Sequence, residues 1–125
     1  MSDRSIDDRG LPEGWPLNPE LEITPREVKQ GLDDGTVLLI DIREPEELAL
    51  ASVSHHLHIP LGDLPARLQE IDADEDTTVA IICHSGRRSL SAAILLKREG
   101  LDGARSVAGG IDLWSIDIDP SVPRY

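Results

Sequence analysis

The stretch that decides the fold reads Val79-Ala80-Ile81-Ile82-Cys83-His84-Ser85-Gly86-Arg87-Arg88-Ser89-Leu90-Ser91-Ala92-Ala93-Ile94-Leu95-Leu96. Its apolar start predicts a buried strand, and its last eight residues predict a helix. The chain's only cysteine follows the strand directly, where open α/β sheets place their reactive groups. Backbone N–H groups at a helix start favour an anion, as do the guanidiniums of Arg87 and Arg88. The stretch therefore predicts a reactive thiolate at Cys83.

Strands and helices alternate on both sides of this stretch. Thr24-Pro25-Arg26-Glu27 is a capping box with proline at the first helical position, so we expect a helix from there to near Gly35. Further strands are expected at 37–41, 58–60, 78–82 and 104–107, and further helices at 45–50, 64–71, 88–99 and from the Gly109-Gly110 turn to Trp114. This alternation predicts an α/β domain with a mostly parallel central sheet flanked by helices.

The two ends of the chain differ from this pattern. Residues 1–22 are rich in proline, glycine and charge, and predict an irregular arm that docks through Trp15. Residues 23–116 form the expected domain, and residues 117–125, with two prolines, an irregular tail. At 125 residues the whole chain fits a single domain.

Composition narrows the classes of partner and the compartment. The formal net charge of −12 argues against nucleic acid and anionic membranes as partners. The sequence has no apolar run of about 20 residues and no apolar signal region at its start. A single cysteine cannot form an internal disulfide, which suits the reducing cytoplasm.

Charge is distributed unevenly around the cysteine. Residues 77–98 contain no Asp or Glu but contain Arg87, Arg88, Lys97 and Arg98. One interpretation is a basic site for an anion. The other is that a buried strand and helix simply lack acidic residues. The sequence leaves both interpretations open.

Four motifs together resemble the rhodanese (sulfurtransferase) family. The loop Cys83-His84-Ser85-Gly86-Arg87-Arg88-Ser89 is similar to the active-site loop of that family. The segments at 41–48, 59–61 and 107–114 resemble its Asp-x-Arg-x-x-x-Glu-aromatic, Ile-Pro and Gly-Gly…Trp motifs in the same order and spacing. Residues 51–56 depart from the pattern, because Ser52 stands where the family usually has His.

The resemblance implies roles for the loop residues. Cys83 would be the nucleophile and, as a persulfide, the sulfur carrier. The backbone N–H groups of His84, Ser85, Gly86, Arg87, Arg88 and Ser89 would form a cradle that binds the substrate, with Gly86 permitting positive φ. Arg88 would be packed and would stabilise the loop or the leaving group, whereas Arg87 would be exposed to the donor. No cofactor is implied.

The resemblance also implies partners. The donor would be a small sulfane compound such as thiosulfate. The segments 64–68 and 107–120 are similar to rhodanese domains fused to adenylating enzymes of molybdopterin and thiamine synthesis, which implies a sulfur-carrier protein as acceptor.

The sequence leaves two other classes of function open. Phosphatases and arsenate reductases of the same fold have loops resembling Cys-x5-Arg, whereas Cys83 to Arg88 is Cys-x4-Arg, a shorter cradle that favours sulfur over phosphate. A non-catalytic binding module is the third class, and the altered segment 51–56 keeps it in consideration.

Several polar residues outside the loop are candidates for the site or for structural roles. Asp41 and Arg43 follow a neighbouring strand and could border the crevice. The favoured alternative is an ion pair between Arg43 and Glu47, four residues apart. His55, His56 and His58 suggest a metal site, but a solvated loop is the favoured interpretation, so no metal is expected.

Overall fold

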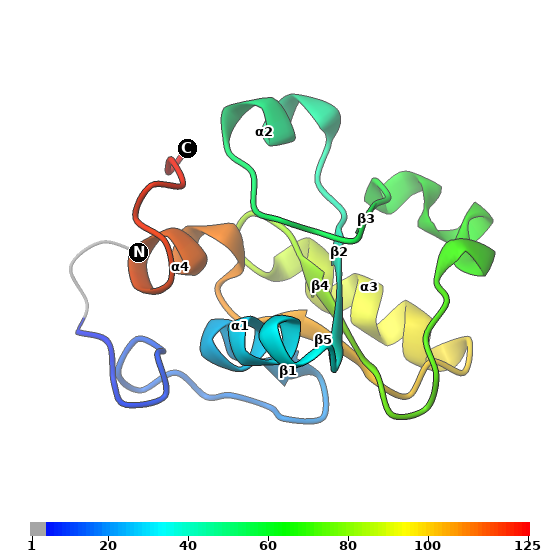
Figure 1. Ribbon diagram of the computed structural model, residues 1–125, viewed down its shortest axis with the longest axis horizontal. Helices are drawn as coiled ribbons and strands as arrows, with labels where there is room; N and C mark the ends of the chain where they lie inside the picture. The colour runs from blue at the N-terminus through cyan, green and yellow to red at the C-terminus, as the bar shows by residue number, and fades with distance from the viewer. Residues whose placement is uncertain (1–4) are drawn as a thin grey trace.

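Five parallel strands form the sheet of the computed structural model, which describes residues 5–125 (Figure 1). The strands lie in the order β1-β5-β4-β2-β3, which confirms the predicted α/β class with a parallel sheet. Their bounds are β1 Glu22–Ile23, β2 Val37–Asp41, β3 Leu57–His58, β4 Thr78–Ile82 and β5 Ala104–Val107. The α-helices are α1 Pro25–Asp34, α2 Pro45–Leu50, α3 Arg87–Arg98 and α4 Gly110–Asp117.

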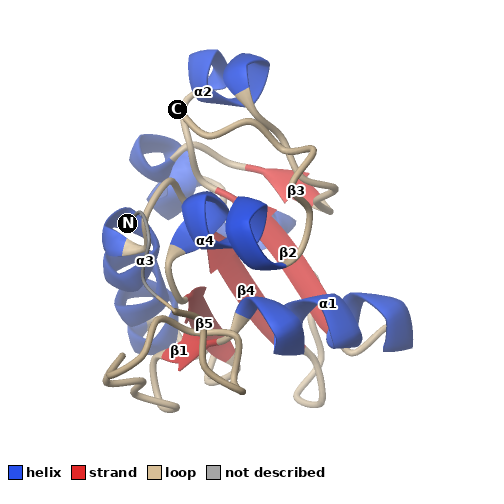
Figure 2. Cartoon of the chain, turned by 90° about the vertical axis from the view of Figure 1, so that its left-hand side faces the viewer, coloured by secondary structure: helices blue, strands red, loops and turns tan. Residues whose placement is uncertain are grey.

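The sheet is covered on both faces, with α1 and α4 on one face and α3 on the other (Figure 2). Successive residues of β4 alternate between these faces: Ala80 and Ile82 pack with α1 and α4, and Val79 and Ile81 pack with α3. This alternation follows from the period of two along a strand. Because both faces are buried, the central strands β2 and β4 are mostly apolar, and the core is almost entirely aliphatic.

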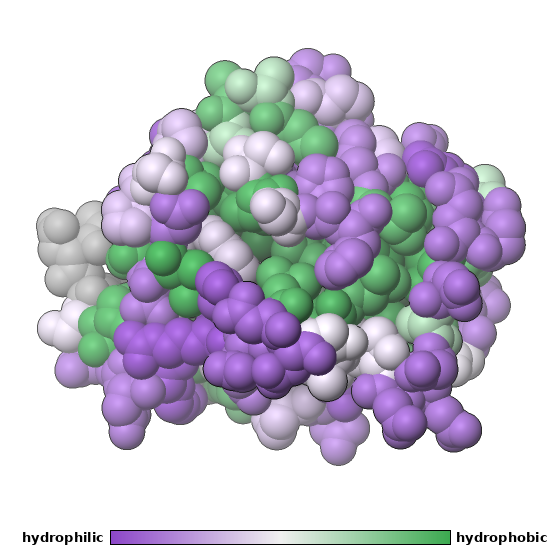
Figure 3. Space-filling model, in the orientation of Figure 1, coloured by the Kyte–Doolittle hydropathy of each residue, from purple (hydrophilic) through white to green (hydrophobic). Residues whose placement is uncertain are grey.

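Helix α1 begins and ends as its sequence predicts. The Thr24 hydroxyl accepts the Glu27 amide at 3.1 Å, and the Glu27 side chain accepts the Thr24 amide at 3.1 Å, which completes the capping box. The helix closes at Gly35, whose φ of 77° lies in the left-handed region. Its charged residues point outward, and the space-filling view is hydrophilic over much of this face (Figure 3).

The prediction of an amphipathic α-helix over 64–71 is wrong. The structure has two short 3-10 helices there, η1 Leu61–Ala66 and η2 Leu68–Glu70. Pro65 lies inside the first, and its ring and missing N–H prevent a continuous α-helix. Leu64 and Ile71 are nevertheless buried, so the apolar pattern identified the inward-facing residues although the helix type was different.

The described part of the N-terminal arm and the segment after α4 both pack onto the domain. In the arm, Leu11 is fully buried against Ala108 and Leu113, and Trp15 packs beside it, while residues 1–4 lie outside the described residues. Helix α4 continues past Trp114 to Asp117, further than expected. Within residues 5–125, no helix is both long and apolar enough to span a membrane.

Candidate functional site

Strand β4 delivers Cys83 to the carboxyl edge of the sheet, beside the end of β2. Asp41 of β2 is in register with Ile82 of β4, and the amide of Ile42 donates to the Ile82 carbonyl at 3.1 Å. The two following segments therefore leave the sheet side by side. This is the position predicted for a site between neighbouring parallel strands.

The sulfur of Cys83 is held by backbone amides and one hydroxyl. The amides of Gly86 and Ser89 donate to Sγ at 3.1 and 3.3 Å, and the Ser89 Oγ lies 3.2 Å from it. Two of the six amides expected in the cradle thus bond the sulfur itself. Cys83 is only 1% exposed, so the sulfur lies within the loop. The sulfur is therefore the atom on which these N–H donors of the loop converge.

A second buried hydroxyl extends this network. Ser106 of β5 lies 2.7 Å from Ser89, oxygen to oxygen, and donates to the Gly86 carbonyl at 3.4 Å. Both serines are buried. Ser106 therefore helps to orient the hydroxyl that faces the sulfur. The sequence signal for it was a hydroxyl at a buried position of an apolar strand.

Two glycines allow the loop its shape. Gly86 caps the start of α3 with φ at 103°, a left-handed conformation that confirms the predicted need for glycine. Gly110 lets the first turn of α4 approach the loop: a Cβ there would lie 2.5 Å from the His84 carbonyl oxygen and 2.6 Å from that of Cys83. At this approach the Ile111 amide donates to the Cys83 carbonyl at 2.8 Å, and the Asp112 amide donates to the His84 carbonyl at 3.0 Å.

The two arginines of the loop have different environments. Arg87 and Ser85 are exposed, whereas Arg88 is half-buried and forms a two-pronged ion pair with Glu47 of α2, at 2.6 and 2.8 Å. The hydrogen bonds from Arg88 lower the pKa of Glu47 to about 2, and the same pair raises the pKa of Arg88. Arg87 is thus exposed as expected, whereas Arg88 packs against α2 and not into the loop.

Arg43 does not form the predicted ion pair with Glu47. Its guanidinium pairs with Asp41 at 2.7 Å, and both side chains are fully buried. It reaches Glu47 only through the backbone carbonyl, at 3.2 Å. The carboxylate of Glu47 is taken by Arg88, a partner 41 residues away. The spacing of four residues predicted the wrong pair because Asp41 lies closer to Arg43.

The three histidines after α2 each hydrogen-bond the backbone, and His56 is exposed while His55 and His58 are half-buried. The ring of His56 accepts the Leu39 amide at 2.9 Å, and the ring of His58 donates to the Arg43 carbonyl at 2.7 Å. His55 donates to the Val53 carbonyl at 2.9 Å. Among the described residues no group of His, Cys, Asp and Glu side chains could hold a metal ion.

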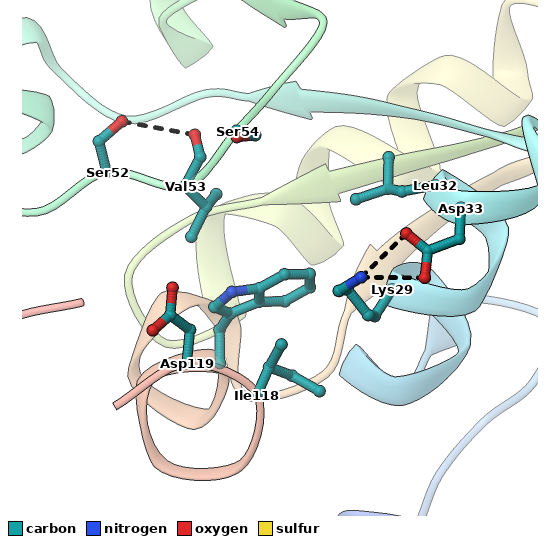
Figure 4. A pocket seen from close by; sticks show the side chains of 9 residues that line it. Lys29, Leu32, Asp33, Ser52, Val53, Ser54, Ile118 and Asp119 are labelled. Atoms are coloured by element: carbon teal, nitrogen blue, oxygen red, sulfur yellow. Dashed lines mark hydrogen bonds and ion pairs between the residues drawn. The ribbon is translucent and has the colours of Figure 1, made fainter. Parts of the chain in front are cut away.

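A groove of about 470 Å³ lies away from the cysteine loop (Figure 4). It separates α1 from the altered segment 51–56 and from the end of α4. Its lining residues are Lys29, Leu32, Asp33, Ser52, Val53, Ser54, Trp114, Ile118 and Asp119. The departure from the family pattern at 51–56 thus shapes this groove.

Sequence reasoning missed four residues that the structure brings to the site or its support: Glu47, Ser106, Gly110 and Tyr125. Glu47 belongs to a motif that the resemblance included, but its partner was misassigned. Tyr125 stacks on His84, with ring centroids 4.1 Å apart. Its only sequence signal was its rarity, because the chain has three aromatic residues and no Phe.

Known proteins are similar to this chain in sequence and in fold. A maize protein named adenylyltransferase and sulfurtransferase MOCS3-1 is 32% identical over 126 residues, covering 96% of this chain and 27% of the maize protein. A sulfurtransferase from Allochromatium vinosum is 38% identical over 95 residues, covering 75% of this chain and 87% of that protein. The crystal structure of a rhodanese-related protein from Thermoplasma volcanium matches with a TM-score of 0.70 and 28% identity, over 84% of this chain and 99% of that one.

The chain therefore spans about a quarter of the maize protein and most of the two others. Residues 24–117 match the model of the family described as rhodanese-like domain. Four motifs, a five-stranded parallel sheet and a cysteine loop at its carboxyl edge agree with this match. The chain belongs to the rhodanese family, and its relatives include sulfurtransferases.

Proposed function

We propose that the protein is a sulfurtransferase that carries a sulfane sulfur as a persulfide on Cys83. One observation carries this proposal: the sulfur of the only cysteine accepts backbone N–H bonds at the carboxyl end of a central strand. The same donors can stabilise a thiolate before transfer and a persulfide after it. Arg88, in the first turn of α3, adds a positive charge to the same loop.

The reaction has two balanced steps. The Cys83 thiolate attacks the outer sulfur of thiosulfate, an S–S bond forms to the protein, and the S–S bond of thiosulfate breaks with its electron pair leaving on sulfite. A nucleophilic acceptor such as cyanide then attacks the outer sulfur of the persulfide. Thiocyanate leaves and the thiolate is restored. Neither step needs an external oxidant or reductant.

Loop length supports sulfur over phosphate as the transferred group. The loop from Cys83 to Arg88 is Cys-x4-Arg, and its amides of Gly86 and Ser89 converge on a single sulfur atom. A phosphate needs donors at about 2.7–3.1 Å from several oxygens at once, which requires a wider ring. Aryl phosphate hydrolysis is therefore expected to be negligible.

The proposal also names an acceptor, a sulfur-carrier protein, and a compartment, the cytoplasm. The maize relative is named for both adenylyl transfer and sulfur transfer, which supports a carrier protein, activated by adenylation, as the acceptor. The net charge of −12 opposes binding to nucleic acid or anionic membrane. A single thiol that must stay reduced fits the cytoplasm.

Intact mass measurement tests this function. The protein is incubated with thiosulfate and weighed, and then treated with cyanide and weighed again. We expect a gain of one sulfur atom that cyanide removes, and no gain in Cys83→Ser. A protein that takes sulfur from no sulfane donor would favour the binding module, and robust hydrolysis of an aryl phosphate would favour the phosphatase.

A further inference from the structure

The segment after α4 folds back beside α2 (Figures 1 and 2). Val122 is buried in the core next to Trp114, and its carbonyl accepts the Ser115 hydroxyl at 2.5 Å. Arg124 then pairs with Asp112 of α4 at 2.8 Å. These attachments fix the segment immediately before Tyr125, so the place of Tyr125 is set by the fold.

The ring of Tyr125 lies flat on a residue of the cysteine loop. It stacks on the His84 imidazole with an interplanar angle of 10°. His84 follows Cys83 directly, and its carbonyl is held by the Asp112 amide. Tyr125 thus holds the side chain of a loop residue whose backbone α4 already holds.

The hydroxyl of Tyr125 binds the segment that follows β2, whereas its ring contacts the cysteine loop that follows β4. The hydroxyl donates to Glu47 Oε2 at 2.6 Å and accepts from Arg43 Nη1 at 3.1 Å. The same Glu47 oxygen receives Arg88 Nη2 at 2.8 Å. Without the phenol, the guanidinium of Arg88 and the Glu44 amide are the donors that orient the Glu47 carboxylate.

We propose that Tyr125 is a positioning residue of the sulfur-transfer site. Its ring fixes His84, and its hydroxyl fixes the Glu47 carboxylate and through it the Arg88 guanidinium. This inference rests on the proposed function of the loop. The physical reason is preorganisation: a cation that faces a developing anion stabilises it most when nothing has to reorient during the reaction.

The hydroxyl and the ring can be tested separately. Tyr125→Phe removes the bond to Glu47 and keeps the stacking on His84, whereas Tyr125→Ala removes both. Leu50→Ala is the control, because Leu50 is an exposed apolar residue of the same helix as Glu47 and 58% of its surface is accessible. Each protein is assayed for kcat and KM with thiosulfate and cyanide.

Two NMR measurements report on the positioning without activity. Stacking shifts the His84 ring protons upfield, and the Glu47 carboxyl carbon follows its titration. In Tyr125→Phe we expect the His84 shift to persist, the pKa of Glu47 to rise, and kcat to fall about 3–10-fold with KM within about twofold. In Tyr125→Ala the His84 shift should be lost and kcat should fall about 10–30-fold. Leu50→Ala should match the wild type.

Each other outcome contradicts a stated part. Wild-type kcat in both Tyr125 variants, with sulfur loading intact in the wild type, overturns the positioning role. Faster turnover in Tyr125→Ala overturns it too, since Tyr125 would then obstruct the donor. If the wild type takes no sulfur, the proposed function fails. The two NMR measurements still decide whether Tyr125 holds His84 and Glu47.

Discussion

Two neighbouring segments leave the carboxyl edge of the sheet, and they are held in opposite ways. The one after β4 fixes the sulfur of Cys83 with backbone amides and depends on the left-handed conformation of Gly86. The one after β2 is fixed by side-chain charges, with Arg43 buried on Asp41. In the proposed function the first segment supplies the chemistry and the second supports it. Arg88 and Glu47 connect the two.

The largest difference between the two segments is expected when Cys83 is replaced. In Cys83→Ser we expect cyanide-dependent sulfur transfer to fall by more than about 1,000-fold, because a hydroxyl is a poor nucleophile and no second thiol exists. The melting temperature should change little, since serine is of similar size and the amide donors remain. Activity within tenfold of wild type would contradict the persulfide mechanism.

Loss of Arg43 should mainly lower stability, whereas loss of Cys83 should mainly lower activity. Arg43→Met leaves the Asp41 carboxylate buried without its cation, which costs about 3–5 kcal/mol of unfolding free energy. Urea unfolding measures this loss. In the double variant Asp41→Leu/Arg43→Met no charge is left unpaired, so much of the stability should return. A single variant as stable as wild type would show that the pair does not hold this segment.

Acid should weaken the link between the two segments. The folded-state pKa of Glu47, about 2, lies below its ordinary value of 4.5, so the carboxylate adds stability above pH 4.5 that is lost as pH falls toward 2. Glu47→Gln lacks this contribution. The difference in unfolding free energy between the two proteins should therefore be largest at neutral pH and shrink in acid. A constant difference across that range would mean that Glu47 titrates normally.

The smallest effect is expected at the exposed arginine. Arg87 is exposed, and no ion pair joins it to any residue from 5 to 125, so Arg87→Ala should leave stability unchanged. We expect KM for thiosulfate to rise about 3–10-fold with kcat nearly constant, because a long-range charge contributes to binding before the reaction. Arg88→Ala should lower both kcat and the melting temperature. Equal effects of the two substitutions would remove the distinction between them.

Short sequence motifs correctly predicted the elements whose ends depend on neighbouring residues in the chain. The capping box at Thr24 and the glycine at 35 placed helix α1, and the apolar run before Cys83 placed β4. The same run placed the cysteine at the sheet edge. The prediction of an α-helix over 64–71 was wrong because Pro65 changed the local geometry, although Leu64 and Ile71 are buried as the apolar pattern required.

Contacts between distant residues were the part that one sequence did not predict. The partner of Glu47 is Arg88 and not Arg43, and the residue on His84 is Tyr125. A spacing of four along a helix offers one candidate pair. The fold brings further candidate partners close together, and the order of the strands in the sheet decides which ion pair forms.

Gly110 has a consequence for the electrical polarity of the cysteine loop. A trans peptide unit directs its C=O and N–H to opposite sides. Ile111 and Asp112 bind the carbonyls of Cys83 and His84, so the N–H groups of His84 and Ser85 face away from α4. Gly110 thus determines, through the close approach of α4, that the N–H ends of these two peptide units are the ones left to face an incoming anion. The packing of α4 therefore sets the direction of two peptide dipoles in the loop.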